Sequence, residues 1–385
     1  MVGAILPWTV WAQSTTESVL QEIEKNNSTL QALRYQAEAQ KINNKTGIFL
    51  TNPQVGFNYL WGSPTEVGNK IALSATQSFD FPSAYKLRNQ VANLKNNVVE
   101  WEYQKQRIEF LFEARKKLVE LAYYNARAEE LQKRLKHAQD LAAAYKKMLD
   151  AGETNTLEYN KTQNSLLMLQ QDYQANHIAQ TTANAELTRL NEGKEIHFME
   201  THLVDAFISR DFEQWYKSLE EKNPVLGWAK EQVLLSQKEI QLSKTLTLPK
   251  FSVGYTGEMV PKEKFHGVAL GLSIPLWETR NMVKAAEANR LAYQQLEQDN
   301  KRQFYQKLKN LHAQAIQLQD ATTKYKQQLE RSNNEFLLQK ALDKGEINLL
   351  TYLMELSLYY AGVDKLLEAE KSMNETLAEL YRYGI

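Results

Sequence analysis

Four short stretches of the chain alternate between bulky apolar residues and small or polar ones, a pattern typical of β-strands with two unlike faces. In QVGFNYLWG, which begins at residue 54, every second position is Val, Phe, Tyr or Trp. The alternation returns three times further along the chain. We therefore predict two hairpins, with strands at about 54–62 and 70–81, and at about 250–257 and 267–275.

Each predicted hairpin is followed by a long stretch with helical periodicity. Neither 83–151 nor 276–344 contains a glycine or a proline. Apolar residues recur at spacings of four and three from Phe304 to Phe336, which is the heptad seam of a coiled coil. We predict long helices over 83–150 and 277–343, each spanning roughly 100 Å at 1.5 Å per residue.

Shorter helices precede the hairpins, and nearly identical turns follow the long helices. Apolar periodicity predicts helices over 15–48, with a break near Asn26–Ser28, and over 225–247. The turn sequences DAGETNTLEYN (150–160) and DKGEINLLTYL (343–353) lie 193 positions apart. We predict tips at 151–156 and 344–348, followed by return helices over 156–190 and 348–381.

The residue types in the two turns fit this role. Gly152 and Gly345 are suited to end the incoming helices, because glycine readily adopts a left-handed conformation just beyond a helix C-terminus. Asn155 and Asn348 are suited to cap the outgoing helices. The correspondence is wider than the turns, since Pro53 matches Pro249 at an offset of 196.

Such a long period indicates two copies of one architecture rather than a solenoid. The offset changes by three between about residues 60 and 78, so the length difference lies in one loop. We predict a first repeat over 13–190, a connector or equatorial region over 191–222, and a second repeat over 223–385.

Composition excludes several classes of function. The 385 residues include 46 basic and 46 acidic side chains, so there is no basic excess of the kind that binds nucleic acid. The chain has no cysteine, which excludes disulfides, thiolate metal sites and catalytic thiols. No nucleophile elbow, P-loop or dinucleotide motif occurs. We therefore expect neither enzymatic activity nor a cofactor.

The first residues, MVGAILPWTVWAQS, form an apolar run closed by small residues. Val10 and Ala12 fit positions −3 and −1 of a signal-peptidase site, so we predict a signal-peptide remnant over 1–12, although the basic n-region is missing. The alternative is a buried N-terminal strand. No uncharged apolar run of about 20 residues occurs, so any membrane-spanning part must consist of strands.

The duplicated hairpins, long helices and glycine tips resemble the TolC-like outer membrane efflux factors from about residue 15 to the end of the chain. GETNTLEY and GEINLLTY are similar to that family's periplasmic tip motif. The resemblance implies a mainly α fold with transmembrane β-strands, built from two tandem repeats of a coiled-coil helical hairpin and a β-hairpin. It also implies a homotrimer in the outer membrane of a Gram-negative bacterium, extending into the periplasm.

Physical reasoning agrees with an oligomer. Four amphipathic strands cannot close a barrel, and an open sheet edge is not tolerated in hydrocarbon. Three chains would supply twelve strands, which lies within the range of outer-membrane barrels. Tyr59, Trp61, Phe81 and Trp277 lie where an aromatic girdle would contact outer-membrane lipid. The resemblance further implies a periplasmic α-helical barrel that continues this β-barrel.

The family resemblance implies a passive conduit that exports small toxic compounds or metal ions. A periplasmic adaptor protein and an inner-membrane pump, which we expect to be proton-driven, would engage the tips. The predicted adaptor contacts are Gly152, Glu153, Thr154, Asn155, Thr156, Leu157, Gly345, Glu346, Ile347, Asn348, Leu349 and Leu350.

The second tip departs from the family pattern. Many members have aspartates here that form acidic rings at the pore entrance, but the corresponding residues are Thr351 and Met354, with Glu355 adjacent. Glu346 and Glu355 are candidates for a replacement ring, and solvated helix-end glutamates are the other interpretation. The predicted pore-entrance residues are Glu346, Thr351, Met354 and Glu355.

One cluster of histidines is a candidate metal site. In HFMETH, residues 197–202, His197, Met199 and His202 lie close together within the connector. The six histidines are otherwise scattered and do not establish a site, so we predict no bound metal.

Two alternatives remain. The conduit could serve type I protein secretion, because in this family the pump chooses the cargo. A periplasmic coiled-coil scaffold would explain the long helices, but not the four alternating strands.

Overall fold

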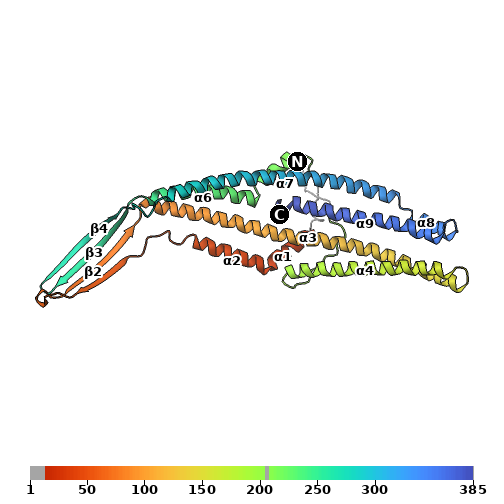
Figure 1. The fold of residues 1–385 in the computed structure, drawn as a ribbon, viewed down its shortest axis with the longest axis horizontal. Coiled ribbons are helices and arrows are strands. Elements are labelled where there is room, and N and C mark those ends of the chain that lie inside the picture. The colour runs from red at the N-terminus through yellow and green to blue at the C-terminus, as the bar shows by residue number, and fades with distance from the viewer. Residues whose placement is uncertain (1–13, 204–207, 385) are drawn as a thin grey trace, which may run out of the picture. The chain divides into compact units, whose positions relative to one another are not determined.

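The computed structural model describes residues 14–203 and 208–384 (Figure 1). The predicted signal-peptide remnant lies outside these residues. The described chain is mostly helical with one small antiparallel sheet, as predicted. It divides into two compact units. The strand unit comprises Ala32–Lys105 and Glu220–Phe304, and the tip unit comprises the described residues within Met1–Gln31, Gln106–Leu219 and Tyr305–Ile385.

The sheet of the strand unit has four strands in the order β1-β2-β3-β4, with every neighbouring pair antiparallel. Figure 1 shows β2, β3 and β4 as adjacent arrows. The strands differ by a few residues from their predicted bounds, mainly because the second hairpin is longer. Their bounds are β1 Gln54–Leu60, β2 Lys70–Phe79, β3 Lys250–Val260 and β4 Glu263–Ser273.

Helical segments accompany this sheet in the strand unit, among them α6 (Pro224–Leu246), most of α2 (Ser28–Asn43) and a short 3-10 turn. α6 begins where the Asn223 side chain accepts hydrogen bonds from the backbone N–H groups of Val225 and Leu226. α2 is tied to the long helix α3 by the Lys41 ammonium, whose Nζ lies 2.7 Å from Glu100. A short 3-10 turn, Thr65–Val67, lies in the loop between β1 and β2.

In the tip unit, α1 (Ser14–Asn26), α3 (Pro82–Asp150) and α4 (Thr156–Leu190) share an apolar core. Figure 1 draws α3 as one uninterrupted ribbon. The core residues include Ile23 of α1, Leu118 of α3 and Leu187 of α4, all fully buried, and Phe198 of the connector. Residues from both ends of the first repeat therefore pack on the same part of α3.

The predicted break between α1 and α2 is confirmed, and its cause is the side chain of Asn27. Its Oδ1 accepts from the backbone N–H of Leu30, and its Nδ2 donates to the carbonyl of Leu190. The amide thus caps α2 and satisfies a carbonyl at the end of α4. Asn27 is buried, so both bonds are shielded from water.

The rest of the tip unit contains α5 (Phe212–Glu220), α7 (Met282–Arg331), α8 (Glu335–Asp343), α9 (Leu349–Leu380) and a 3-10 turn, Arg382–Gly384. α5 is held to α7 by aromatic and polar contacts. The Tyr305 hydroxyl donates to Glu213 at 2.6 Å, and His312 Nε2 lies 2.6 Å from the carbonyl oxygen of Ser209.

One predicted helix is interrupted. The sequence predicts a single helix over 277–343, whereas the structure has α7 ending at Arg331 and α8 beginning at Glu335. Ser332 bonds back to the carbonyls of Gln328 and Leu329, and the side chain of Asn333 accepts from the N–H of Glu335. Serine and asparagine favour such local bonds over helix continuation. The heptad seam fails at the same place, because Phe336 is 78% exposed.

Candidate functional site

The first tip reverses the chain with a complete C-capping motif. Gly152 has a φ of +74°. Its N–H donates to the carbonyl of Leu149, and the N–H of Glu153 donates to that of Met148. These two bonds form a Schellman motif, which satisfies carbonyls that the last helical turn leaves without partners.

The second tip repeats the same geometry. Gly345 has a φ of +69°, its N–H donates to Leu342, and the N–H of Glu346 donates to Ala341. The outgoing helices are capped alike, as the sequence predicts. Asn155 accepts from the N–H of Glu158, and Asn348 accepts from that of Thr351.

The residues predicted to contact an adaptor divide into exposed and anchoring side chains. The leucines that follow the asparagine caps are exposed, with 66% of Leu157 and 50% of Leu350 accessible. Glu153 and Glu346 are exposed as well. Leu349 is different, because it is 3% exposed and packs with Leu141, Tyr352 and Leu356. Its side chain anchors the second tip to the apolar cluster between α3 and α9.

Three of the predicted pore-entrance residues, Thr351, Met354 and Glu355, are exposed residues of α9, and Glu346 lies in the turn before it. Thr351 donates its hydroxyl to Asn348 and so belongs to the cap. Met354 is 59% exposed, and Glu346 and Glu355 are exposed. Leu350, Met354 and Leu358 follow one another at spacings of four, which places an apolar stripe on the same helix. The acidic ring therefore stays a prediction about an assembly of several chains.

A buried polar network underlies the second tip. Tyr352 is fully buried, and its hydroxyl lies 2.8 Å from His137 Nε2 and 2.8 Å from Gln339 Oε1. His137 Nδ1 lies 3.3 Å from the Tyr360 hydroxyl. Arg134 donates to the carbonyl of Tyr360 and pairs with Asp364 at 2.9 Å. The network joins α3, α8 and α9.

Burial sets the protonation of the two tyrosines. It raises the pKa of Tyr352 and of Tyr360 well above the ordinary value of 10, and the negative charge of Glu335 adds to the effect. Both hydroxyls therefore remain protonated and can donate at any physiological pH. Sequence reasoning missed this network because the histidine and its tyrosine partners are 215 and 223 positions apart.

The sheet has one apolar and one polar face, as the alternation predicts. The register pairs Phe57 with Leu73, and Ala75 with Tyr255, on one face. That face carries Val55, Phe57, Tyr59, Ile71, Leu73, Ala75, Phe79, Phe251, Val253, Tyr255, Met259, Val268, Leu270 and Leu272, together with Gln77, Gly257, Lys264 and His266. Many of these side chains are exposed, among them Val268 at 74% and Leu270 at 79%.

The opposite face is formed mainly by small residues: Gly56, Asn58, Ala72, Ser74, Thr76, Ser78, Ser252, Gly254, Thr256, Gly267, Ala269, Gly271 and Ser273. Charged residues on this face lie toward the ends of the strands. Lys70 and Glu258 form an ion pair of 2.6 Å. The middle of the face therefore offers hydroxyl and backbone groups but no net charge.

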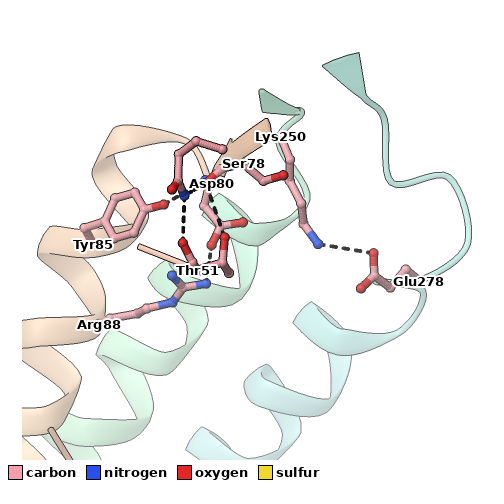
Figure 2. Close-up of polar contacts among 8 residues, drawn as sticks. Thr51, Ser78, Asp80, Tyr85, Arg88, Lys250 and Glu278 are labelled. Carbon is pink, nitrogen blue, oxygen red and sulfur yellow. Dashed lines mark hydrogen bonds and ion pairs between the residues drawn. The ribbon is translucent and has the colours of Figure 1, made fainter. Parts of the chain in front are cut away.

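Polar contacts fix the junction where strands meet helices in the strand unit (Figure 2). The Asp80 N–H donates to the Tyr85 hydroxyl, and Arg88 donates to the Asp80 carboxylate at 2.5 Å. On the other hairpin, the Lys250 ammonium lies 3.4 Å from Glu278. Neither the strand pattern nor the turn motifs predicts these contacts, and the only sequence signal for them is a charged residue directly beside a strand end.

The connector histidines do not assemble a metal site. Ile196 and Phe198 are buried, whereas the alternate residues His197 and Met199 are exposed. His202 instead lies 3.9 Å from Glu370 of α9. Among the described residues, no group of three or more His, Cys, Asp or Glu could hold a metal ion.

Within residues 14–203 and 208–384, no helix combines the length and apolar character needed to cross a membrane.

Comparison with known proteins identifies relatives by structure alone. No family model matches the chain, and no curated protein matches its sequence. Several solved structures are similar over nearly its whole length, and three of them illustrate the likeness. CusC has a TM-score of 0.78 at 14% identity, covering 99% of this chain and 95% of that one.

The other two are bacterial outer-membrane proteins. VceC of Vibrio cholerae has a TM-score of 0.78 at 12% identity, covering 98% of each chain. The open state of the MtrE outer membrane channel of Neisseria gonorrhoeae has a TM-score of 0.77 at 13% identity, covering 96% of this chain and 88% of that one. At such identities the likeness establishes the fold, and the chain shares the fold of these proteins.

Proposed function

We propose that this chain, whose TolC-like fold was predicted from its sequence and is confirmed by its structural neighbours, is one subunit of an outer-membrane efflux channel. In this proposal three copies form a passive conduit from the periplasm to the exterior. An adaptor protein and an inner-membrane pump deliver the cargo, which we take to be small toxic compounds or metal ions. The observation that carries the proposal is the exposed apolar face of the sheet.

The two faces of the sheet suit a membrane channel wall. The apolar face would contact lipid, and the small, neutral residues of the opposite face would line a wide polar passage. β1 and β4 are the outer strands of the sheet, and each pairs on one side only. In the hydrocarbon core of a bilayer, the backbone groups along such edges need hydrogen-bond partners. Neighbouring copies can supply them, so that three sheets of four strands close into one barrel.

The tips support the docking part of the proposal. Two turns with the same backbone geometry each present a leucine and a glutamate at the surface. Exposed apolar side chains on an ordered turn suit contact with another protein. The scaffold alternative leaves the apolar sheet face without an explanation.

The test is to express the chain with an intact signal peptide in a Gram-negative host and to analyse the outer-membrane fraction before and after boiling. We expect a trimer that dissociates only on heating. Leu270→Lys places a charge on the apolar face, at a cost of about 2–4 kcal/mol in a bilayer, and should abolish the trimer.

Ala269→Lys is the matched control, because it introduces the same charge on the opposite face of the same strand. It should assemble normally. A periplasmic monomer of the native chain, or equal assembly of the two variants, would contradict the proposal.

A further inference from the structure

The break after α7 leaves a short separate helix, α8, directly before the second tip. α8 has nine residues, fewer than the roughly 12 that make an isolated helix even marginally stable in water. It is separated from α7 by residues 332–334. Its position therefore depends on its tertiary contacts. The first tip has no such segment, since α3 runs unbroken to Asp150.

Apolar contacts supply part of the attachment of α8. Leu338 and Leu342 pack against the cluster of Leu141, Leu349 and Tyr352. These contacts lie toward the C-terminal part of α8. The N-terminal end of α8 has different surroundings, because Phe336 and Leu337 are 78% and 60% exposed. The contacts that hold the N-terminal end of α8 are hydrogen bonds between polar side chains.

The hydrogen-bond directions in the network can be assigned from one fixed group. The side-chain nitrogen of Gln339 donates to Asp343 at 2.8 Å, so its oxygen is free to accept. The Tyr352 hydroxyl donates to that oxygen. It must then accept from His137 Nε2, which therefore carries a proton. In neutral His137 the other nitrogen, Nδ1, is an acceptor.

Protonation of His137 would reverse one hydrogen bond. When Nδ1 is bare, the Tyr360 hydroxyl donates to it across 3.3 Å and has no proton left for another acceptor. When Nδ1 gains a proton, it donates to the Tyr360 oxygen. The Tyr360 proton is then available to the carboxylate of Glu335, whose Oε1 lies 3.5 Å away. Glu335 is the first residue of α8.

We propose that His137 is a proton-responsive clamp that fastens the N-terminal end of α8 when the imidazole is protonated. In the neutral state α8 is attached to α3 and α9 by its apolar contacts and by the hydrogen bonds of Gln339. In the protonated state an unbroken chain runs from His137 through Tyr360 to Glu335. Histidine is the side chain suited to such a change, because it commonly changes charge between about pH 5 and pH 8.

The charges around the clamp are compatible with a positive imidazole. Asp140 from α3 and Glu335 from α8 line the same cleft as His137, and Asp343 of α8 accepts from Gln339. The neighbouring cation Arg134 is paired with Asp364 of α9. Lys136, directly before His137 on α3, is exposed to solvent, and Lys133 is paired with Glu130 of its own helix. The Tyr352 and Tyr360 hydroxyls and the side-chain oxygen of Gln339 also face the ring.

The clamp links acidity to the position of the second tip. α8 leads directly into the turn at Gly345. Fastening the start of α8 therefore restricts the motion of this turn, which contains Glu346 and leads to Leu350 at the start of α9. The consequence for adaptor docking rests on the proposed function. The clamp itself is a property of one chain and can be tested whether or not that function holds.

The experiment is hydrogen exchange of the purified full chain at pH 5.5 and pH 7.5, with intrinsic exchange rates corrected for pH. We expect the α8 amides to exchange on the order of tenfold more slowly at pH 5.5, because a hydrogen bond to a charged group is gained. Amides of the first tip should show no such change.

Tyr360→Phe removes the relaying hydroxyl while keeping the ring and His137, and should abolish the pH effect on α8. His137→Gln should do the same. Tyr359→Phe, which removes a neighbouring hydroxyl outside the relay, should retain it. If the native chain shows no pH effect on α8, or if Tyr360→Phe behaves like Tyr359→Phe, the clamp does not exist. Because exchange is read from α8 in any oligomeric state, failure of trimer assembly would be a separate result.

Discussion

At the scale of single residues, the tips depend on backbone conformation rather than on packing. A methyl group added at Gly152 or Gly345 would meet no heavy atom within 4 Å. Both residues nevertheless lie in the left-handed region, where an L-residue is strained. The requirement for glycine at the tips is therefore conformational.

We expect Gly345→Ala to destabilise the second tip by about 1 kcal/mol, because only the backbone penalty applies. Faster hydrogen exchange of the Gly345 and Glu346 amides would report it. Gly345→Asn is the control, since asparagine tolerates this region better than alanine. Equal exchange in the alanine variant and the native chain would show that the turn does not need its positive φ.

At the scale of elements, several helices are capped at their N-termini by the side chain of one asparagine. Asn27, Asn155, Asn223 and Asn348 each cap a helix. α2 is additionally tied to α3 by the ion pair of Lys41 and Glu100. This hydrogen bond from Lys41 lowers the pKa of Glu100 below its usual value of 4.5.

The sign of the pH effect follows from that lowered pKa. The stabilisation by Glu100 is present above pH 4.5 and is lost as the pH falls through its folded-state pKa. We expect faster exchange of α2 amides on acidification below pH 4.5, and less of this change in Glu100→Gln. Both side chains are partly exposed, so the pair contributes about 1 kcal/mol or less.

Glu102→Gln serves as the control for this measurement, because Glu102 pairs with Lys105 of its own helix. It should leave the acid response of α2 unchanged. An identical acid response in Glu100→Gln and the native chain would mean that the ion pair does not hold α2.

At the scale of the whole molecule, the exposed surfaces are those that the proposed assembly would use. The apolar sheet face, the open strand edges and the exposed tip leucines all lack partners within the described chain. Their burial would have to come from lipid, further copies and an adaptor, respectively. Each of these surfaces can be altered without disturbing the chain's own core.

We expect the double variant Leu157→Ser and Leu350→Ser to reduce efflux at least several-fold in a host whose own outer-membrane channel is deleted, with the trimer unaffected. The reason is loss of apolar docking surface at both tips. Leu291→Ser, which alters a leucine that is 60% exposed on α7, is the control and should retain efflux. Full efflux by the double variant would remove the tip leucines from the docking surface.

Local patterns in the sequence determined much of this protein. Period-two alternation specified four strands and their two faces, because side chains of a strand point alternately to opposite sides. The absence of glycine and proline specified α3, and the Gly and Asn of each turn specified how the chain reverses. These features depend on residues within a few positions of one another.

Only the tertiary structure decided the rest. The sequence placed Phe336 on a continuous seam, whereas Ser332 and Asn333 end α7 through local bonds that outweigh the heptad pattern. Leu349 and Leu350 are adjacent and chemically alike, yet one is buried against α3 and the other is exposed. The contacts of His137 with Gln339, Tyr352 and Tyr360 join residues about 200 positions apart. Such contacts exist only once the helices pack together, so no local pattern encodes them.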